Sequence, residues 1–322
     1  MLKTMRVFAP GKLFVIGEYA VLAGGRALVA ALDAGIRCDV EPDAGKVGRI
    51  VASDLGVDLP VDAGMVDPRA SLLASAAVAA ARDFDVRETL RYHVFGARPA
   101  ACRKIGLGGS AASVVAVVAA TAAVSGEDLA SHDVRERIFA TARRVHVENQ
   151  GGQGSGADVA ASVFGGWLDY ALAEGSARIR QAKLPNEARI AAAFSGFPSD
   201  TRAAIGGVDV RLLREPLDRF WWAIEHDRRS TARDALCAFG DALHASSRPG
   251  PGVDRVREFV AGARAAGAAA KGSGAIGGDC AIAFGFESGS ITAAETAWRR
   301  LGAEVLDVHI DRLGVRREEC HG

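Results

Sequence analysis

The distribution of apolar and polar positions differs between the first third of the chain and the rest. Near the N-terminus, short apolar runs are broken by glycine and proline, which is the pattern of strands joined by turns. It predicts strands at Arg6–Ala9, Ala27–Leu32, Ile36–Val40 and Arg91–Phe95, with one helix at Pro68–Ala81. This part of the chain is therefore predicted to be mainly sheet.

Longer apolar stretches with helical spacing begin near residue 110. They predict helices at Ser110–Val124, Asp133–Glu148 and Ser155–Phe164, followed by a strand at Gly166–Tyr170. The most apolar stretch, Ala111–Val124, has 14 residues. A membrane-spanning helix needs about 18 or more. We therefore expect a buried helix there and no membrane partner.

The second half mixes strands and helices without the regular alternation of a doubly wound parallel sheet, so an α+β protein is predicted. A polar, proline-containing turn at Lys183–Glu187 marks the expected boundary between two domains, residues 1–185 and residues 186–322. The elements expected in this half are strands at Arg189–Phe194, Cys280–Phe284 and Glu304–Val308, and helices at Leu213–His226, Ser230–Ala245, Val253–Ala266 and Ile291–Leu301.

Composition and charge narrow the classes of function. With 322 residues, 49% of them apolar, the chain can bury a large core and form two domains of about 150 residues each. Lys+Arg and Asp+Glu each number 39, and this zero net charge argues against nucleic acid or an anionic membrane as a partner. The five cysteines form no C-x-x-C pair and no targeting segment is visible, so we expect a cytoplasmic protein.

Glycine-rich segments hold the candidate chemistry. In Ala9–Gly25, a Pro-Gly turn follows a strand and precedes Lys12, and Glu18 lies further along. On the residues alone, Lys12 is typical of a solvated charge and Glu18 of a surface or capping carboxylate. Neither residue by itself predicts a site.

A second segment, Lys104–Val115, places three glycines directly before a long apolar helix. Gly106, Gly108 and Gly109 permit close backbone approach, and Ser110 is a natural N-cap. The free N–H groups and the positive dipole at such a helix start suit a phosphate, although the same loop can serve packing alone. The segment lacks the G-x-x-x-x-G-K-S/T pattern of a Walker A loop.

Two further glycine clusters follow. In Gln150–Gly166, Ser155 can cap a helix whose first turn includes Asp158, so a capping pair explains both residues. The cluster Lys271–Phe284 precedes a strand and by itself is typical of a loop. Only the combination of these clusters points to a function.

Taken together, the clusters resemble the three motifs of the GHMP kinases, a family that includes galactokinase, homoserine kinase, mevalonate kinase and phosphomevalonate kinase. The motifs occur in the family's order at Pro10–Leu22, Gly106–Ser113 and Ser273–Ala283. The resemblance therefore spans nearly the whole chain.

Within the family, the sequence is most similar to the phosphomevalonate kinase branch. Tyr19 stands where mevalonate kinases usually carry histidine, and His146 precedes a segment, Gly154–Ala161, that matches the branch without a gap. Ser195–Arg202 also looks like a degenerate form of the branch's substrate loop, in which Thr201 is retained.

The resemblance implies an N-terminal domain related to ribosomal protein S5 domain 2, a ferredoxin-like C-terminal domain, and ATP with Mg²⁺ as cofactors. The implied reaction is ATP-dependent phosphorylation of 5-phosphomevalonate to 5-diphosphomevalonate in the mevalonate route to isoprenoids. Mevalonate kinase, another GHMP small-molecule kinase and a non-catalytic nucleotide-binding protein are the alternatives. The sequence leaves open whether the protein is a monomer or a homodimer.

Carried onto this sequence, the family's motifs give Lys12, Asp158 and Ser110 as catalytic residues, and Ser110 and Glu148 as ligands of Mg²⁺. On the residues alone, Glu148 is more typical of an exposed helix carboxylate than of a metal ligand. The expected ATP-binding residues are Lys104, Gly106, Leu107, Gly108, Gly109, Ser110 and Ala111. The expected substrate-binding residues are Lys12, Tyr19, His146, Ser155, Gly156, Asp158, Thr201, Arg202, Ser273 and Gly274.

Two positions depart from the family's pattern. Gly109 stands where the family usually has serine, and Ile276 where it usually has glycine. A β-branched residue is strained at positive φ, so we expect the loop around Ile276 to differ locally from the family's.

Overall fold

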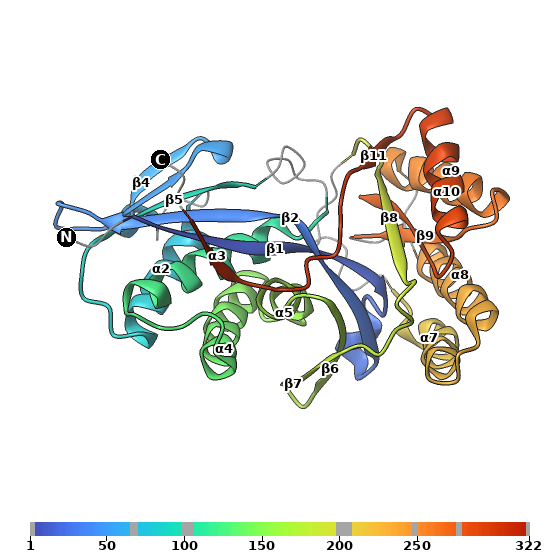
Figure 1. Cartoon of the computed structure of the whole chain (residues 1–322), viewed down its shortest axis with the longest axis horizontal. Helices are drawn as coiled ribbons and strands as arrows, with labels where there is room; N and C mark the ends of the chain where they lie inside the picture. The colour runs from blue at the N-terminus through green and yellow to red at the C-terminus, as the bar shows by residue number, and fades with distance from the viewer. Residues whose placement is uncertain are drawn as a thin grey trace.

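Two sheets, each with its own helices, lie at opposite ends of the long axis of the molecule (Figure 1). The computed structural model describes residues 4–64, 70–97, 106–197, 208–246, 250–274 and 279–319. Within those ranges, the first sheet has eight strands in the order β12-β1-β2-β5-β3-β4, with β6 pairing with β2 and with β7. The strands are β1 (Met5–Ile16), β2 (Arg26–Pro42), β3 (Arg49–Ala52), β4 (Val57–Pro60), β5 (Leu90–Gly96), β6 (Trp167–Ala173), β7 (Ser176–Gln181) and β12 (Arg316–Glu318).

The long antiparallel pair of β1 and β2 is the backbone of this sheet. The two strands that the sequence predicts at Ala27–Leu32 and Ile36–Val40 are one continuous strand, β2. Gly35 allows the strand to continue because a Cβ atom there would lie 2.1 Å from the carbonyl oxygen of Ala9. The register shift next to Ala9 therefore depends on close backbone approach at a glycine.

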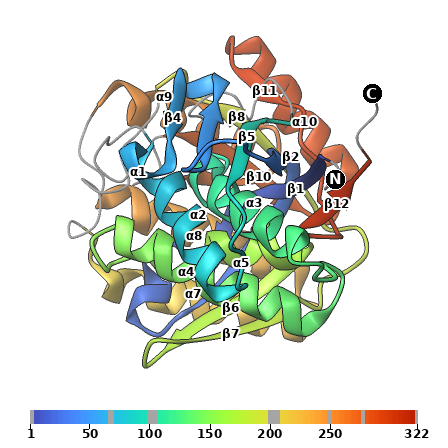
Figure 2. The same ribbon diagram turned by 90° about the vertical axis from the view of Figure 1, so that its left-hand side faces the viewer.

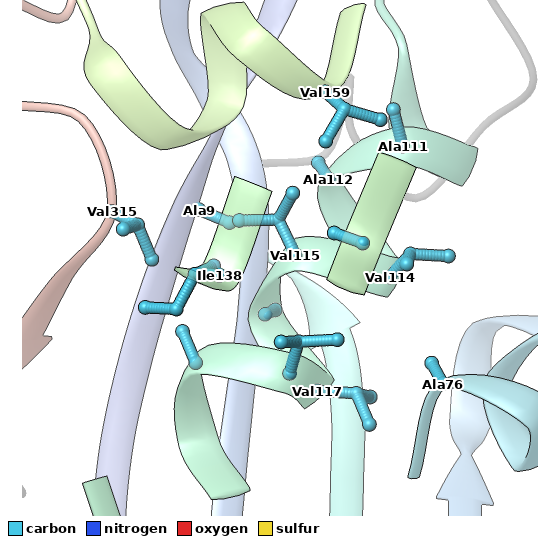
Figure 3. Close-up of a cluster of buried hydrophobic side chains, with 14 of the residues drawn as sticks. Ala9, Ala76, Ala111, Ala112, Val114, Val115, Val117, Ile138, Val159 and Val315 are labelled. Atoms are coloured by element: carbon cyan, nitrogen blue, oxygen red, sulfur yellow. The ribbon is translucent and has the colours of Figure 1, made fainter. Parts of the chain in front are cut away.

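Four helices, α2 (Ser71–Asp83), α3 (Gly109–Val124), α4 (His132–Asn149) and α5 (Ala157–Phe164), lie together on one side of β1 and β2 (Figure 1). The central one, α3, is built almost entirely from alanine and valine, and most of its side chains are buried. Figure 3 shows its residues Val114, Val115 and Val117 packed among side chains of neighbouring elements. Small side chains let α3 lie close to the sheet, so the start of the helix is held near β1.

The second sheet has the strand order β11-β8-β10-β9 among the described residues. Along β8, Ala191 and Ala193 face α9 and α10, whereas Ala192 and Phe194 face α7 and α8, as expected for a period of two. The strands are β8 (Arg189–Phe194), β9 (Ala269–Ser273), β10 (Cys280–Gly285) and β11 (Glu304–Leu306), and the helices are α7 (Val210–Glu225), α8 (Arg229–Ala245), α9 (Pro251–Ala265) and α10 (Ser288–Arg300).

The two sheets share a buried core, and the end of the chain returns from the second sheet to the first. One buried cluster joins Leu13 and Leu28 of the first sheet to Phe284 of the second. Strand β12, near the end of the chain, lies beside β1 (Figure 2) and pairs with it from Arg6 opposite Glu318 onward. The α+β prediction is confirmed. No helix in the described ranges is both long enough and apolar enough to cross a membrane.

Three short helical segments complete the described chain: η1 (Ala20–Ala23), η2 (Ser53–Leu55) and α1 (Val61–Gly64). Of these, η1 includes the end of the first motif and contacts α7. It therefore lies where the two sheets meet.

Candidate active site

The second glycine-rich loop lies across the middle of β1, over Lys12. The backbone N–H of Lys12 donates to the carbonyl oxygen of Leu107 (2.7 Å), and its Nζ donates to that of Gly106 (3.2 Å). Gly108 has φ +80°, and a Cβ atom there would lie 2.6 Å from Cγ of Lys12. The glycine is therefore required both by its backbone conformation and by the stem of the lysine beneath it.

Helix α3 begins immediately after this loop. Its N-cap is Gly108, so the prediction that Ser110 caps the helix is wrong: a left-handed glycine takes that position, and Ser110 falls in the first turn. Gly109 and Ser110 are exposed, whereas the side chains of Leu107 and Ala111 are buried.

The start of α3 has the features that a nucleotide phosphate needs. Its first-turn N–H groups have no partner inside the helix, and the helix is long enough, at 16 residues, to have a substantial dipole. Gly109 has no atom within 4 Å of a Cβ atom added to it. The space there would accept the serine that the family usually carries, so this departure does not disturb the loop.

Three side chains form a continuous path from α3 to α5. Ser110 Oγ lies 3.2 Å from Nε2 of His146, on α4. Nδ1 of His146 lies 3.7 Å from Oδ2 of Asp158, on α5. His146 is buried between the two, with only 2% of its surface exposed. The structure thus brings together two of the residues predicted to be catalytic, through a third that was predicted to bind substrate.

Asp158 lies in the first turn of α5, which packs against β1. The Pro-Gly turn that the sequence predicts before Lys12 is wrong, because β1 continues through Pro10 and Gly11 with a register shift between Ala9 and Gly11. Oδ1 of Asp158 accepts a hydrogen bond from the backbone N–H of Val159 (2.9 Å). One helical turn later, the buried hydroxyl of Ser162 donates to the carbonyl oxygen of Pro10 (2.6 Å). This bond, which sequence reasoning missed, ties α5 to β1 two residues before Lys12.

The loop that leads into α5 is held from two sides. Tyr170 and Arg143 both donate to the carbonyl oxygen of Ser155, at 2.5 Å and 3.3 Å. Burial raises the pKa of Tyr170 to about 12, so its hydroxyl remains a donor at neutral pH. Gly156, with φ +81°, is the N-cap of the helix, so Ser155 is not the cap that the sequence predicts. Instead, Oγ of Ser155 accepts from the N–H of Ala157 (3.3 Å).

The third motif contacts both of the other motifs. Ser273 Oγ donates to the carbonyl oxygen of Phe14 on β1 (3.2 Å). A Cβ atom on Gly274 would lie 2.2 Å from Oδ2 of Asp279, and one on Gly106 would lie 2.7 Å from Cβ of the same aspartate. Asp279, which the sequence did not single out, is therefore packed between the second and third motifs.

A buried ion pair joins the first motif to the strand that leads into the third. Nζ of Lys271, on β9, donates to Oε1 of Glu18, and the two residues are 0% and 5% exposed. Burial lowers the pKa of Lys271, while the charge of Glu18 opposes this shift. The expectation that Glu18 is a surface or capping carboxylate is wrong, because Lys271 lies in a strand that packs against the end of β1 and not in a loop.

Other predicted residues lie further from this group or outside the described ranges. Tyr19 is half-buried at φ +60° and packs against the core that the two sheets share. Lys104, Thr201, Arg202 and Ile276 are outside the described residues.

The metal expectation rests on Ser110 and Glu148. Glu148 is exposed and follows His146 by two positions on α4, so it does not share the face from which His146 reaches Ser110. No group of three or more His, Cys, Asp or Glu in the described part of the chain is arranged to hold a metal ion. Kinases usually hold Mg²⁺ through one or two protein oxygens and the substrate phosphates, and the exposed hydroxyl of Ser110 fits that donor set.

Comparison with known proteins shows which families and folds the chain is similar to. Residues 71–166 match the family described as GHMP kinases N terminal domain. A phosphomevalonate kinase from Streptomyces sp. (strain CL190) is 29% identical over 369 aligned positions, which cover 93% of this chain and 95% of the relative. A mevalonate kinase from Aeropyrum pernix is 28% identical over 341 positions, which cover 99% of this chain and 100% of the relative.

Among solved structures, the phosphomevalonate kinase of Streptococcus pneumoniae, in complex with phosphomevalonate and AMPPNP, has a TM-score of 0.79 at 22% identity. The match covers 96% of this chain and 100% of that structure. The chain therefore has the GHMP kinase fold and contains the family's N-terminal domain, as its motifs predict. The two relatives, which align with 93% and 99% of this chain, are named phosphomevalonate kinase and mevalonate kinase.

Proposed function

We propose that this protein transfers the γ-phosphoryl group of ATP to 5-phosphomevalonate and releases 5-diphosphomevalonate and ADP. One observation carries the proposal. Lys12 is held beneath the glycine loop by its bond to Gly106, and beside it the exposed start of α3 leads through Ser110 and His146 to Asp158. Three groups thus lie in sequence: the Lys12 cation, a helix start that suits an anion, and the Asp158 carboxylate.

Phosphoryl transfer depends mainly on positioning and on neutralising charge, with little covalent chemistry from the protein. In this proposal, the backbone of residues 106–111 and the start of α3 hold the β- and γ-phosphates of ATP. One of the three N–H donors of Lys12 is bonded to Gly106, and the others can turn to the transferring phosphoryl group. Mg²⁺ held by Ser110 together with the phosphate oxygens would supply further positive charge there, whereas Glu148, on another face of α4, is not placed to share that ion directly.

The choice of acceptor determines what Asp158 has to do. An alcohol acceptor needs a base, whereas a phosphate monoester has a second pKa near about 6 and is largely deprotonated at neutral pH. With phosphomevalonate, Asp158 therefore orients the acceptor and Lys12 more than it removes a proton. We propose that Tyr19, Ser155, Gly156, Ser273 and Gly274 line the acceptor side, with His146 acting from behind Ser110 and Asp158.

Phosphomevalonate carries both a carboxylate and a phosphate, so its pocket needs more cationic donors than a pocket for mevalonate. We propose that Lys104 and Arg202, with Thr201, supply them; this rests on the motifs in the sequence. Two comparisons support this acceptor: the Streptomyces relative is named a phosphomevalonate kinase, and a structure of similar fold holds phosphomevalonate with AMPPNP.

Mevalonate is the second candidate acceptor, because the relative from Aeropyrum pernix is named a mevalonate kinase and aligns with 99% of this chain at a similar identity. A non-catalytic nucleotide-binding role is less well supported, since Lys12, Ser110 and Asp158 are all present.

A coupled ADP-release assay across four acceptors tests the proposal: phosphomevalonate, mevalonate, galactose and homoserine. We expect kcat/KM to be highest for phosphomevalonate by about a hundredfold or more, since each charged hydrogen bond lost changes affinity about ten- to a hundredfold. Comparable kcat/KM on mevalonate and phosphomevalonate would favour the mevalonate kinase alternative. ATP binding without turnover on any acceptor would favour the non-catalytic one.

A further inference from the structure

His146 has an arrangement that its surroundings do not explain as packing. Its ring lies on α4 between α3 and α5, with 2% of the residue exposed. Nδ1 is buried and has no hydrogen-bond partner among the described residues, although Oδ2 of Asp158 lies 3.7 Å away, beyond hydrogen-bond range. A buried polar atom without a partner is costly, so an apolar side chain would suit a purely structural role better.

The neighbours of the ring determine where its proton lies. An ionised carboxylate can only accept hydrogen bonds, so Asp158 favours a proton on Nδ1 of His146. In the neutral ring, Nε2 is then an acceptor. With this tautomer, Ser110 Oγ, 3.2 Å from Nε2, is the donor in that bond.

This direction of the bond decides what the exposed side of Ser110 can bind. A hydroxyl has one proton, and here it points inward to His146. The oxygen faces outward with lone pairs only, so it can coordinate a cation but cannot donate to a phosphate oxygen. A serine at the start of a phosphate-binding helix could otherwise do either.

We propose that His146 is a positioning residue. Its Nε2 accepts the hydrogen bond of the Ser110 hydroxyl, so that Ser110 presents its oxygen to the nucleotide-bound cation. The same ring fixes the position of Ser110 relative to Asp158. The inference rests on the proposed function, because it assumes that a nucleotide occupies the start of α3. It adds the orientation of the serine and the residue that sets it.

Two single variants test the contributions of the two ring nitrogens one at a time. In His146→Gln, the longer side chain can place an amide oxygen near the position of Nε2 and keep an acceptor for Ser110. In His146→Asn, the shorter side chain reaches only the position of Nδ1, on the Asp158 side. His146→Phe removes both contacts at similar volume. Glutamine and asparagine are tolerated inside helices, and thermal unfolding of each variant checks that it is folded.

The decisive readout is the binding of ADP, measured by calorimetry with and without Mg²⁺. We expect Mg²⁺ to strengthen ADP binding in the wild type and in His146→Gln, and expect this strengthening to fall by about tenfold or more in His146→Asn and His146→Phe. Binding of ADP alone should change little in all variants. Ser110→Ala should lose the same strengthening, and adding His146→Phe to it should cause no further loss, because both act through one oxygen.

Kinetics gives a second readout that a structural role would not produce. His146→Gln should keep the KM for ATP near that of the wild type and lower kcat, because it restores the acceptor for Ser110 but not the contact toward Asp158. Equal strengthening of ADP binding by Mg²⁺ in the wild type and His146→Phe would overturn the inference, as would rescue by asparagine and not by glutamine. The proposed function fails separately, if the wild type binds Mg·ADP but transfers no phosphoryl group to any acceptor.

Discussion

Lys12 and Asp158 lie on different elements, β1 and α5, which the Ser162–Pro10 hydrogen bond holds together. In the proposed function, both groups act on charge at the reacting centre and not on the nucleotide base. We therefore expect Lys12→Met and Asp158→Asn each to lower kcat by about 10²- to 10⁴-fold while ATP binding persists. Steady-state kinetics and titration with a fluorescent ATP analogue measure the two quantities.

Exposed residues of the same type serve as controls. Lys46→Met and Asp218→Asn make the same chemical changes at exposed positions and should leave kcat unchanged. If Asp158→Asn kept a near-wild-type kcat and lost only about 1 kcal/mol of stability, its carboxylate would stabilise the first turn of α5 and do nothing more.

At the level of elements, the start of α3 depends on the backbone of Gly108. Gly108→Ala would strain a residue at φ +80° and push its Cβ atom to 2.6 Å from Cγ of Lys12, so we expect lower stability, weaker ATP binding and lower kcat. The strain alone costs about 1–2 kcal/mol.

Gly126, just beyond the other end of the same helix, separates strain from contact. It has φ +87° and no atom within 4 Å of an added Cβ atom. Gly126→Ala should therefore lose similar stability, measured by urea unfolding, with ATP binding and kcat intact. Equal kinetic effects of the two substitutions would mean that the loop does not position Lys12.

The sequence predicted elements well where apolar periodicity was long. Helix α3 was expected at Ser110–Val124 and is Gly109–Val124. Short edge strands were missed: β12, Arg316–Glu318, has only charged residues, and it forms because pairing with β1 brings Glu318 to Arg37 (2.6 Å). Such a strand has no pattern of its own, since its stability comes from a partner far away in the chain.

In the candidate site, too, some features could be predicted from the local sequence and others could not. The motifs located Lys12, the glycine loop and Asp158, because each depends on local backbone geometry. The Glu18–Lys271 pair joins residues 253 positions apart, and no local pattern indicates it. The one signal available was an isolated lysine at the start of an apolar, glycine-rich segment, where a buried charge needs a partner.

At the level of the whole molecule, the Glu18–Lys271 pair connects the end of β1 in the first sheet to β9 in the second. Removing one partner leaves an uncompensated buried charge, so Lys271→Met or Glu18→Gln alone should each cost about 3–5 kcal/mol of unfolding free energy. The double variant should be closer to the wild type than either single variant. Urea unfolding of the four proteins completes the double-mutant cycle.

An exposed pair provides the comparison. Glu295→Gln removes an i,i+4 partner of Arg299 on α10, where surface pairs are worth about 0.3–0.5 kcal/mol. If the single variants at Glu18 and Lys271 were as mild as this one, the pair would not stabilise the contact between the sheets.

We propose that the boundary between the two domains lies in the Lys183–Glu187 turn, with residues 1–185 holding the nucleotide loop and residues 186–322 the third motif. After the second sheet, the chain returns to the first sheet, where β12 pairs with β1. In this arrangement the nucleotide loop and the third motif meet at Asp279, so contact between the sheets is part of the site.

A competition experiment between the two acceptors directly tests whether phosphomevalonate is the substrate. Equal concentrations of mevalonate and phosphomevalonate are supplied with limiting ATP, and the products are read by ³¹P NMR, which distinguishes a phosphate monoester from a diphosphate. We expect the phosphoryl group consumed from ATP to appear in the diphosphate of 5-diphosphomevalonate while mevalonate remains unreacted. New phosphate monoester formed from mevalonate, with phosphomevalonate unchanged, would contradict the proposal.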